Sequence, residues 1–156
     1  MRIRPATAAD VPAMARIRAE EWESFEYWLA RIAGYLEGTH SPRNSLPTRA
    51  AFVASIDDAI IGFVAGHLTD RYGCTGELEW INVTGTHRGR GVASALLRAI
   101  AAWFVDAGAT HVCVDVDPAN LSARRLYESH GARALNPHWL VWDDIGIVLR
   151  GGSSVP

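Results

Sequence analysis

The apolar residues from Val92 to Asp106 recur every three or four positions, a pattern that predicts an amphipathic helix. Gly108 follows and suits the left-handed residue that commonly ends a helix. A shorter helix is expected over 120–130, where Gly131 stops it. The second half of the chain is therefore expected to contain two helices.

Two more helices are expected near the start of the chain. Thr7 and Asp10 have the spacing of a capping pair and open a helix that runs to about Glu20. One apolar stripe at helical spacing continues over 22–36 until glycine and proline interrupt it, so 38–47 is expected to be a loop.

Alternating or continuous apolar runs, separated by turn residues, predict the strands. The runs lie at 1–6, 50–56, 60–68, 77–83 and 111–117, with one or two closing strands between 133 and 149. Asp57 and Asp58 have the composition of a hairpin turn. Because the 111–117 run follows a helix, it is expected as a crossover strand parallel to 77–83. The pattern predicts an α/β (α+β) fold with a mixed sheet.

Length and composition fit one globular enzyme domain. The chain has 156 residues, 49% of them hydrophobic and 21% charged, with a formal net charge of -2. One domain over 1–150 and a flexible tail over 151–156 are expected. The charge gives no basic footprint for nucleic acid, and no apolar run approaches the roughly 20 residues that cross a bilayer. Neither nucleic acid nor a membrane is an expected partner.

The cysteines and histidines give no sign of a metal site or a disulfide scaffold. Cys74 and Cys113 are too few for a disulfide framework, and no pair of histidines has the helical spacing of metal ligands. No secretory leader pattern opens the chain. A cytoplasmic protein without a bound metal is expected. The chain also lacks lysine, which excludes a lysine Schiff base.

A glycine-rich corner joins an apolar strand to the helix that opens at Val92, and its sequence is Arg88-Gly89-Arg90-Gly91-Val92-Ala93. Its two glycines allow a sharp bend, and a helix start presents unpaired N–H donors with a partial positive charge. Its two arginines add guanidinium groups. The corner is suited to a phosphate or pyrophosphate, with a plain glycine turn as the alternative.

Two motifs together resemble those of the GNAT acyl-CoA-dependent N-acetyltransferases. The corner resembles that family's Gln/Arg-x-x-Gly-x-Gly/Ala motif, and 120–128 (Asn-Leu-Ser-Ala-Arg-Arg-Leu-Tyr-Glu) resembles its Asn-x-x-Ala-x-x-Leu-Tyr-Glu helix. The close similarity covers about 77–131. One departure is Ala132, where relatives often carry Phe.

The resemblance implies a mostly antiparallel sheet of six or seven strands with about four flanking helices. Its two central parallel strands would splay apart to admit acetyl-CoA. The coenzyme would contact the backbone of Asn82 and Val83, its pyrophosphate would rest on the amides of 88–93, and Asn120 would join this cofactor site. A homodimer is suggested by the family alone.

Three side chains are candidates for catalysis. In the family, a phenol near the coenzyme sulfur stands at the position of Tyr127, which could protonate the leaving thiolate; a core tyrosine packed with Leu126 is the alternative. Glu77 and Glu79 lie two apart, hence on one strand face unless a bulge intervenes, and either could remove a proton from the acceptor amine. Glu77 aligns better with the family's catalytic glutamate.

The expected function is transfer of an acetyl or short acyl group from acetyl-CoA to an amine of a small molecule or a protein N-terminus, by direct attack in a ternary complex. An acidic and aromatic segment, 20–28, is either a site for a cationic amine or solvated surface. The alternative function is a non-catalytic acyl-CoA-binding module. A nucleotide-binding Rossmann domain is disfavoured because the glycine corner follows several strands and lacks the third glycine.

Overall fold

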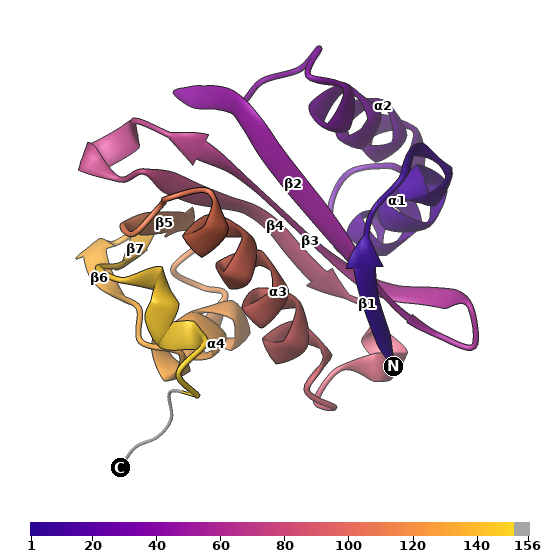
Figure 1. Cartoon of the computed structure of the whole chain (residues 1–156). Helices are drawn as coiled ribbons and strands as arrows, with labels where there is room; N and C mark the ends of the chain where they lie inside the picture. The colour runs from indigo at the N-terminus through magenta and orange to yellow at the C-terminus, as the bar shows by residue number, and fades with distance from the viewer. Residues whose placement is uncertain (152–156) are drawn as a thin grey trace.

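A seven-stranded sheet forms the centre of the molecule, with the strand order β1-β2-β3-β4-β5-β7-β6 (Figure 1). The computed structural model describes residues 1–151, and most of the expected tail, 152–156, lies outside the described residues. The strands are β1 (Arg2–Pro5), β2 (Ser45–Ile56), β3 (Ala59–Thr69), β4 (Gly76–Val83), β5 (Val112–Asp115), β6 (Arg133–Asn136) and β7 (Trp139–Trp142). Among the strands of residues 1–151, only β4 and β5 run parallel to each other, which confirms the predicted mixed, mostly antiparallel sheet.

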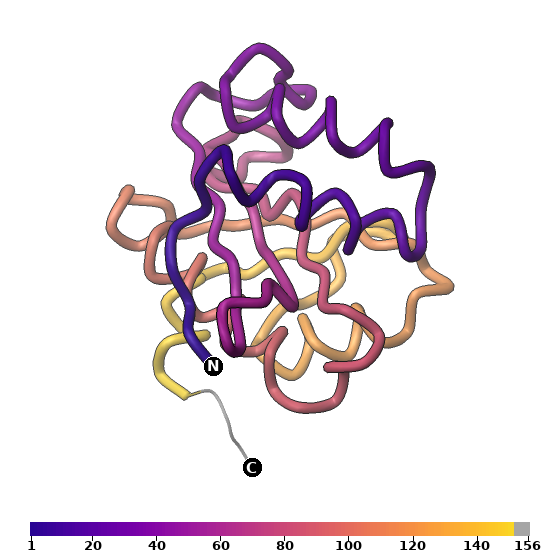
Figure 2. The backbone as a smooth tube through the Cα atoms, turned by 90° about the vertical axis from the view of Figure 1, so that its right-hand side faces the viewer, coloured from indigo at the N-terminus to yellow at the C-terminus, as the bar shows by residue number. Residues whose placement is uncertain are grey.

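Helices cover both faces of this sheet. They are α1 (Val11–Ala19), α2 (Phe25–Glu37), α3 (Val92–Asp106) and α4 (Leu121–Ser129). The first two lie on one side of the strands and the last two on the other (Figures 1 and 2). No helix within 1–151 has the length and apolar character needed to cross a bilayer.

Each face of the sheet has its own apolar core. The core under α1 and α2 includes Met14, Ile32, Tyr35, Phe63 and Trp80. The core under α3 and α4 includes Leu78, Leu96, Ile100, Phe104 and Trp142. Burial of these large side chains, which the helical and strand periodicities predict, is the main force that holds the layers together.

The predicted capping pair joins β1 to the first helix. The Asp10 carboxylate accepts hydrogen bonds from the Thr7 N–H and from both terminal nitrogens of Arg4, each at 2.8 Å. The helical segment begins with a short 3-10 turn, Ala8–Asp10, and continues as α1. One carboxylate therefore satisfies a free helical N–H and an arginine of the neighbouring strand.

The second strand begins earlier than expected. We predicted a loop over 38–47, but β2 starts at Ser45, which pairs with Thr69. Pro47 favoured a loop, yet the register of β2 against β3 shifts between Ser45 and Arg49. An irregular stretch of this kind accommodates a proline because no ladder hydrogen bond depends on its missing N–H.

The parallel pair separates as the resemblance implied. β4 and β5 pair only from Gly76–Val112 to Leu78–Val114. From Glu79 to Val83, β4 continues without a partner on its β5 side among the described residues. The two strands therefore open into a wedge.

A bulge in β4 lies at the start of this wedge. Ala65 of β3 pairs with Trp80 and the next residue, Gly66, pairs with Leu78, so Glu79 is the extra residue. Leu78 packs in the core under α3 whereas Trp80 packs in the core under α1 and α2. The bulge thus reverses the alternation of side chains, so that Trp80 faces α1 and α2.

Candidate active site

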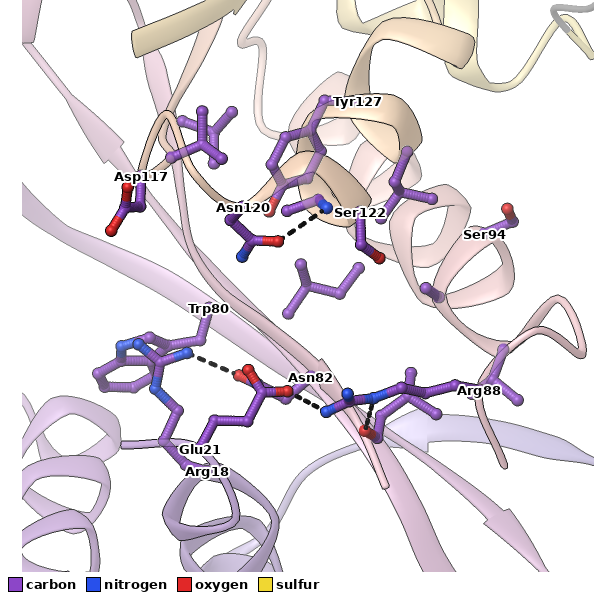
Figure 3. Close-up of a pocket in the computed structure, with 18 of the residues that line it drawn as sticks. Arg18, Glu21, Trp80, Asn82, Arg88, Ser94, Asp117, Asn120, Ser122 and Tyr127 are labelled. Atoms are coloured by element: carbon purple, nitrogen blue, oxygen red, sulfur yellow. Dashed lines mark hydrogen bonds and ion pairs between the residues drawn. The ribbon is translucent and has the colours of Figure 1, made fainter. Parts of the chain in front are cut away.

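A cavity of about 680 Å³ fills the wedge between the separated strands (Figure 3). One wall is β4 from Glu79 to Val83, and the other is the end of β5 with the two residues that follow it, from Val114 to Asp117. The remaining lining comes from the end of α1, the glycine corner with the start of α3, and α4. Most of the residues that the sequence assigned to cofactor and catalysis meet here, although they come from four separate elements.

The glycine corner presents a row of free backbone donors to this cavity. Gly89 and Gly91 have φ of 74° and 81°, the left-handed conformation that glycine adopts at little cost. Within 1–151, no backbone N–H from 88 to 94 donates a hydrogen bond to the protein. Donors that converge at a helix N-terminus in this way form a binding site for an anion.

The two arginines of the corner have different surroundings. Arg88 lines the cavity, pairs with Glu21 near the end of α1, and donates from Nε to the Val83 carbonyl at 3.2 Å. Arg90 is exposed and lies outside the cavity lining. Arg88 is therefore the guanidinium of the pair that lies at the predicted cofactor site.

Asn82, Val83 and Asn120 also line the cavity, as do Val92 and Ala93 at the start of α3. The Asn82 side-chain oxygen accepts a hydrogen bond from Arg18 Nη1 at 2.9 Å. Asn120 caps α4 by accepting the Ala123 N–H at 3.1 Å. The Asn120 side chain thus fixes the start of the helix that carries Tyr127.

Tyr127 extends from α4 with its hydroxyl directed toward the cavity (Figure 3). The side chain is 5% exposed, and its ring packs edge-on against Trp142 with centroids 5.7 Å apart. Burial raises the pKa of the Tyr127 phenol, so this group keeps its proton in the neutral range. The residue combines both readings of the sequence, since its ring is part of the core while its hydroxyl faces the cavity.

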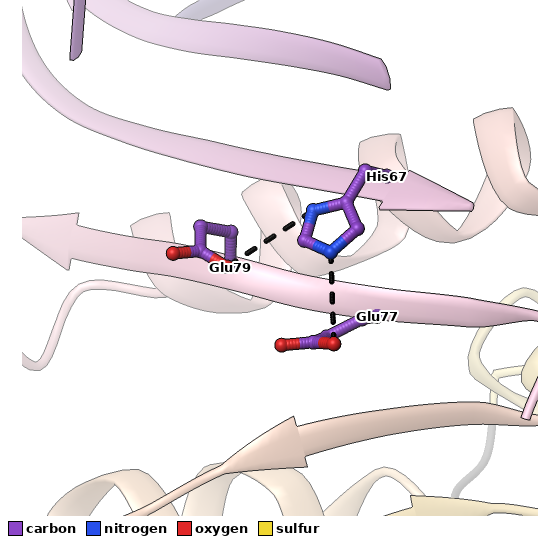
Figure 4. Close-up of side chains that lie close together, drawn as sticks. All are labelled: His67, Glu77 and Glu79. Carbon is purple, nitrogen blue, oxygen red and sulfur yellow. Dashed lines mark ion pairs between the residues drawn. The ribbon is translucent and has the colours of Figure 1, made fainter. Parts of the chain in front are cut away.

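The two candidate carboxylates occupy different environments (Figure 4). Glu79 lines the cavity, and burial raises the pKa of its carboxyl group. Glu77 lies outside the lining; its Oε1 is 3.1 Å from Arg71 Nε and 3.6 Å from His67 Nε2. The sequence favoured Glu77 as the base, but of the two carboxylates only Glu79 lines the cavity.

His67 connects these carboxylates and was not singled out by the sequence. It is fully buried on β3, 4.0 Å from Glu79 through Nδ1, which also contacts the Tyr35 hydroxyl at 2.9 Å. His67, Glu77 and Glu79 bring possible metal-ligand atoms within 4.8 Å of one another. However, Arg71 already supplies a cation to Glu77. The three residues come from two strands, so spacing along the chain gave no signal of the cluster.

Arg18 is a second residue that sequence reasoning missed. It extends from the last turn of α1 into the cavity wall, with its guanidinium 4.7 Å from the ring of Trp28. Along the sequence it is one of two arginines in the last turn of the helix, the other being Arg16. Only its place opposite the bulged part of β4 distinguishes it.

The geometry is accompanied by similarity to known proteins. The chain is 31% identical over 88 residues to the aminoglycoside N(6')-acetyltransferase type 1 of Salmonella typhimurium, a match that covers 53% of this chain and 61% of that protein. The chain thus spans less than two thirds of the length of the curated relatives it matches.

Solved structures show the same fold. The aminoglycoside 6'-N-acetyltransferase of Acinetobacter haemolyticus superposes with a TM-score of 0.72 at 23% identity, over 87% of this chain and 93% of that chain. The PaiA N-acetyltransferase of Thermoplasma acidophilum, solved in complex with coenzyme A, gives a TM-score of 0.67 at 14% identity, over 92% and 98% of the two chains. The Acetyltransferase (GNAT) family matches residues 13–132, most of the sequence. With this match and the splayed β4 and β5 in agreement, the chain belongs to the GNAT acetyltransferase family.

Proposed function

We propose that the protein transfers an acetyl or other short acyl group from acetyl-CoA to a primary amine, by direct attack in a ternary complex. The observation that carries this proposal is the row of unpaired backbone N–H groups from 88 to 94 at one end of the wedge. Such donors match the pyrophosphate of the coenzyme, because buried or cavity-facing backbone N–H groups require an acceptor.

The residues present fit the rest of the coenzyme as well. The open β4 edge at Asn82 and Val83 offers main-chain groups to the pantetheine amides, as an added strand would use them. Arg88 adds a positive charge beside the corner, although Glu21 partly neutralises it. When bound, acetyl-CoA supplies a thioester whose acyl carbon accepts the amine lone pair while the C–S electron pair leaves on sulfur.

The chain contributes a base and an acid to this reaction. Glu79 takes the proton that the attacking nitrogen loses, directly or through water, because its carboxylate lines the cavity and its pKa is raised toward neutrality. Tyr127 donates its hydroxyl proton in a hydrogen bond to the departing sulfur. A neutral phenol suits this role because it stabilises the developing thiolate without prior ionisation.

The acceptor is a small-molecule amine or a protein N-terminus. Relatives named aminoglycoside acetyltransferases favour the small molecule. We also propose, from sequence alone, that the protein is cytoplasmic and that residues 1–150 act as one domain.

A thiol-release assay tests the proposal. Purified protein with acetyl-CoA should release free thiol when supplied with acceptors from a panel of amino acids, polyamines, aminoglycosides and peptides. Thermal shift with acetyl-CoA and NAD side by side should show stabilisation by acetyl-CoA only, since a ligand that prefers the native state raises the melting temperature. Stabilisation by acetyl-CoA without thiol release from any acceptor would instead support the non-catalytic binding module.

A further inference from the structure

Arg18 presents a fixed guanidinium to the cavity from the α1 side (Figure 3). Arg18 Nη1 donates a hydrogen bond to the Asn82 side-chain oxygen at 2.9 Å. The Arg18 Cζ atom lies 4.7 Å from the centroid of the Trp28 ring. A guanidinium held between an amide oxygen and an aromatic face has little rotational freedom. The orientation of Arg18 is therefore set before any substrate binds.

This guanidinium has no carboxylate partner in the part of the chain that the structure describes. None of the ion pairs involves Arg18, and its buried Nε has no hydrogen-bond acceptor. The nearby Glu21 already pairs with Arg88. A partly buried cation that is this poorly satisfied is unfavourable in the free protein, since buried charges and donors are normally paired.

Negative charge lines other parts of the same cavity. Asp115 and Asp117 lie on the β5 side and Glu79 lies at the bulge, whereas Arg18 approaches from α1. Arg18 therefore lies near Glu79, whose charge acts on it, while further negative groups lie on the β5 side of the cavity. This arrangement can bind a molecule that carries both an ammonium and a carboxylate, with its carboxylate on Arg18 and its ammonium beside the negative groups.

We infer that the acceptor is an amine that also carries a carboxylate, such as an amino acid, and that Arg18 binds this carboxylate while the amine faces Glu79. This inference specifies the acceptor of the proposed acyl transfer. It rests on the proposed function for the acylation of the amine. An arginine fork binds a carboxylate through two parallel N–H···O bonds, and Arg18 retains free N–H donors for this purpose. Arg18 is thus a specificity residue for the acceptor.

Binding and turnover of matched ligands test the inference. The ligands are α-, β- and γ-amino acids, each beside the amine that lacks the carboxylate, measured by calorimetry on protein saturated with coenzyme A and by thiol release with acetyl-CoA. Arg18→Met removes the charge with similar bulk, and Arg18→Lys keeps the charge without the fork. Arg16→Met, on the exposed side of the same helix, is the matched control.

The native protein should prefer the best amino acid over its decarboxylated amine, and Arg18→Met should reduce affinity and kcat/KM for that amino acid by about 10- to 100-fold. Arg18→Lys should fall between, and Arg16→Met should match the native protein. The decarboxylated amine and coenzyme A should bind all variants equally. Equal use of both members of each pair, or equal losses for both in Arg18→Met, would overturn the inference while leaving acyl transfer intact. Arg18-dependent amino-acid binding without thiol release would instead retain the site and refute the transfer.

Discussion

At the scale of single residues, the environment of Glu79 governs how the rate should depend on pH. Burial raises the pKa of this carboxyl group above the ordinary value of 4.5, and the nearby His67 only partly offsets the effect. A base must be ionised to accept a proton, so the rate of the native protein should rise with pH through the raised pKa. The rising part of the pH–rate profile should therefore lie at higher pH than the range in which an exposed glutamate titrates.

Glu79→Gln keeps the shape of the side chain and removes the base. We expect acetyl transfer to slow by about 100- to 10,000-fold while acetyl-CoA binding is unchanged. The rise of the rate with pH should disappear. Steady-state rates between acidic and mildly alkaline pH provide the measurement. Glu77→Gln, outside the cavity lining, is the comparison; if that variant loses the rise with pH and Glu79→Gln keeps it, Glu77 is the base.

Glu79→Gln should also change the free energy of unfolding, in a direction that follows from the raised pKa of Glu79. Because the Glu79 pKa is raised, the native state binds this proton more tightly than the unfolded state, and stability is lost as pH rises through the native pKa. Glu79→Gln should therefore be more stable than the native protein above that pKa. The advantage should vanish below the ordinary value of 4.5, which urea unfolding at both pH values would reveal.

Tyr127 contributes its hydroxyl to the cavity and its ring to the core. Tyr127→Phe preserves the edge-on contact with Trp142, so folding and coenzyme binding should be retained. Loss of the proton donor should lower kcat by about 100-fold, at the lower end of the usual range for acid catalysis. A Phe variant that acylates at the native rate would leave Tyr127 a purely structural role.

At the scale of elements, the Asp10 carboxylate links β1 to α1 through Arg4 and Thr7. Asp10→Ala should reduce the free energy of unfolding by about 1.5–3 kcal/mol, because it removes a helix cap and a charged hydrogen bond. The arginine beside Asp10 lowers the pKa of its carboxyl group, so this contribution is present above the unfolded pKa and is lost as pH falls through the native pKa. Urea unfolding at neutral and acidic pH should show the difference only at neutral pH.

The glycine corner is expected to bind the coenzyme through its backbone, so a substitution there can act through conformation or through charge. A Cβ at Gly91 would meet no protein atom within 4 Å, so the left-handed φ of 81° rather than lack of space requires glycine in the free protein. Gly91→Asp adds a negative charge beside the proposed pyrophosphate site and should weaken acetyl-CoA binding by 100-fold or more, an order-of-magnitude expectation for an unfavourable charge in a binding site. Gly91→Asn has nearly the same shape, tolerates the left-handed conformation and is neutral.

Calorimetric titration with acetyl-CoA compares the two variants. Gly91→Asn should keep most of the affinity that Gly91→Asp loses. Equal losses in both would show that backbone strain, and not charge at the corner, explains the effect.

The elements themselves were largely predictable because each rests on a local pattern. The stripe of α3, the capping pair at Asp10 and the crossover strand β5 all appear where periodicity and turn residues indicated. The early start of β2 was not predictable, because pairing with β3 accommodates a proline that locally favours a loop. The bulge at Glu79 has no local sequence signal either, since it exists only as a difference in register between two strands.

At the scale of the whole molecule, the site depends on side chains that converge from distant segments. The two motifs located the corner and Tyr127 because each motif spans the start of a helix and has a recognisable sequence. Arg18 and His67 could not be found in this way, because their roles arise from contacts with β4 across 64 and 10 positions of the chain, to Asn82 and Glu77 respectively. The separation of Glu77 from Glu79 likewise follows from the register of the sheet.

The proposed function depends on the unpaired amides of the corner, which are expected to hold the diphosphate of acetyl-CoA within the wedge. A crystal structure of the protein with acetyl-CoA tests it directly. Diphosphate oxygens should lie about 2.7–3.2 Å from backbone nitrogens of residues 88–94, with the thioester between Glu79 and Tyr127. A coenzyme bound elsewhere, with the corner amides making no contact to it, would contradict the account.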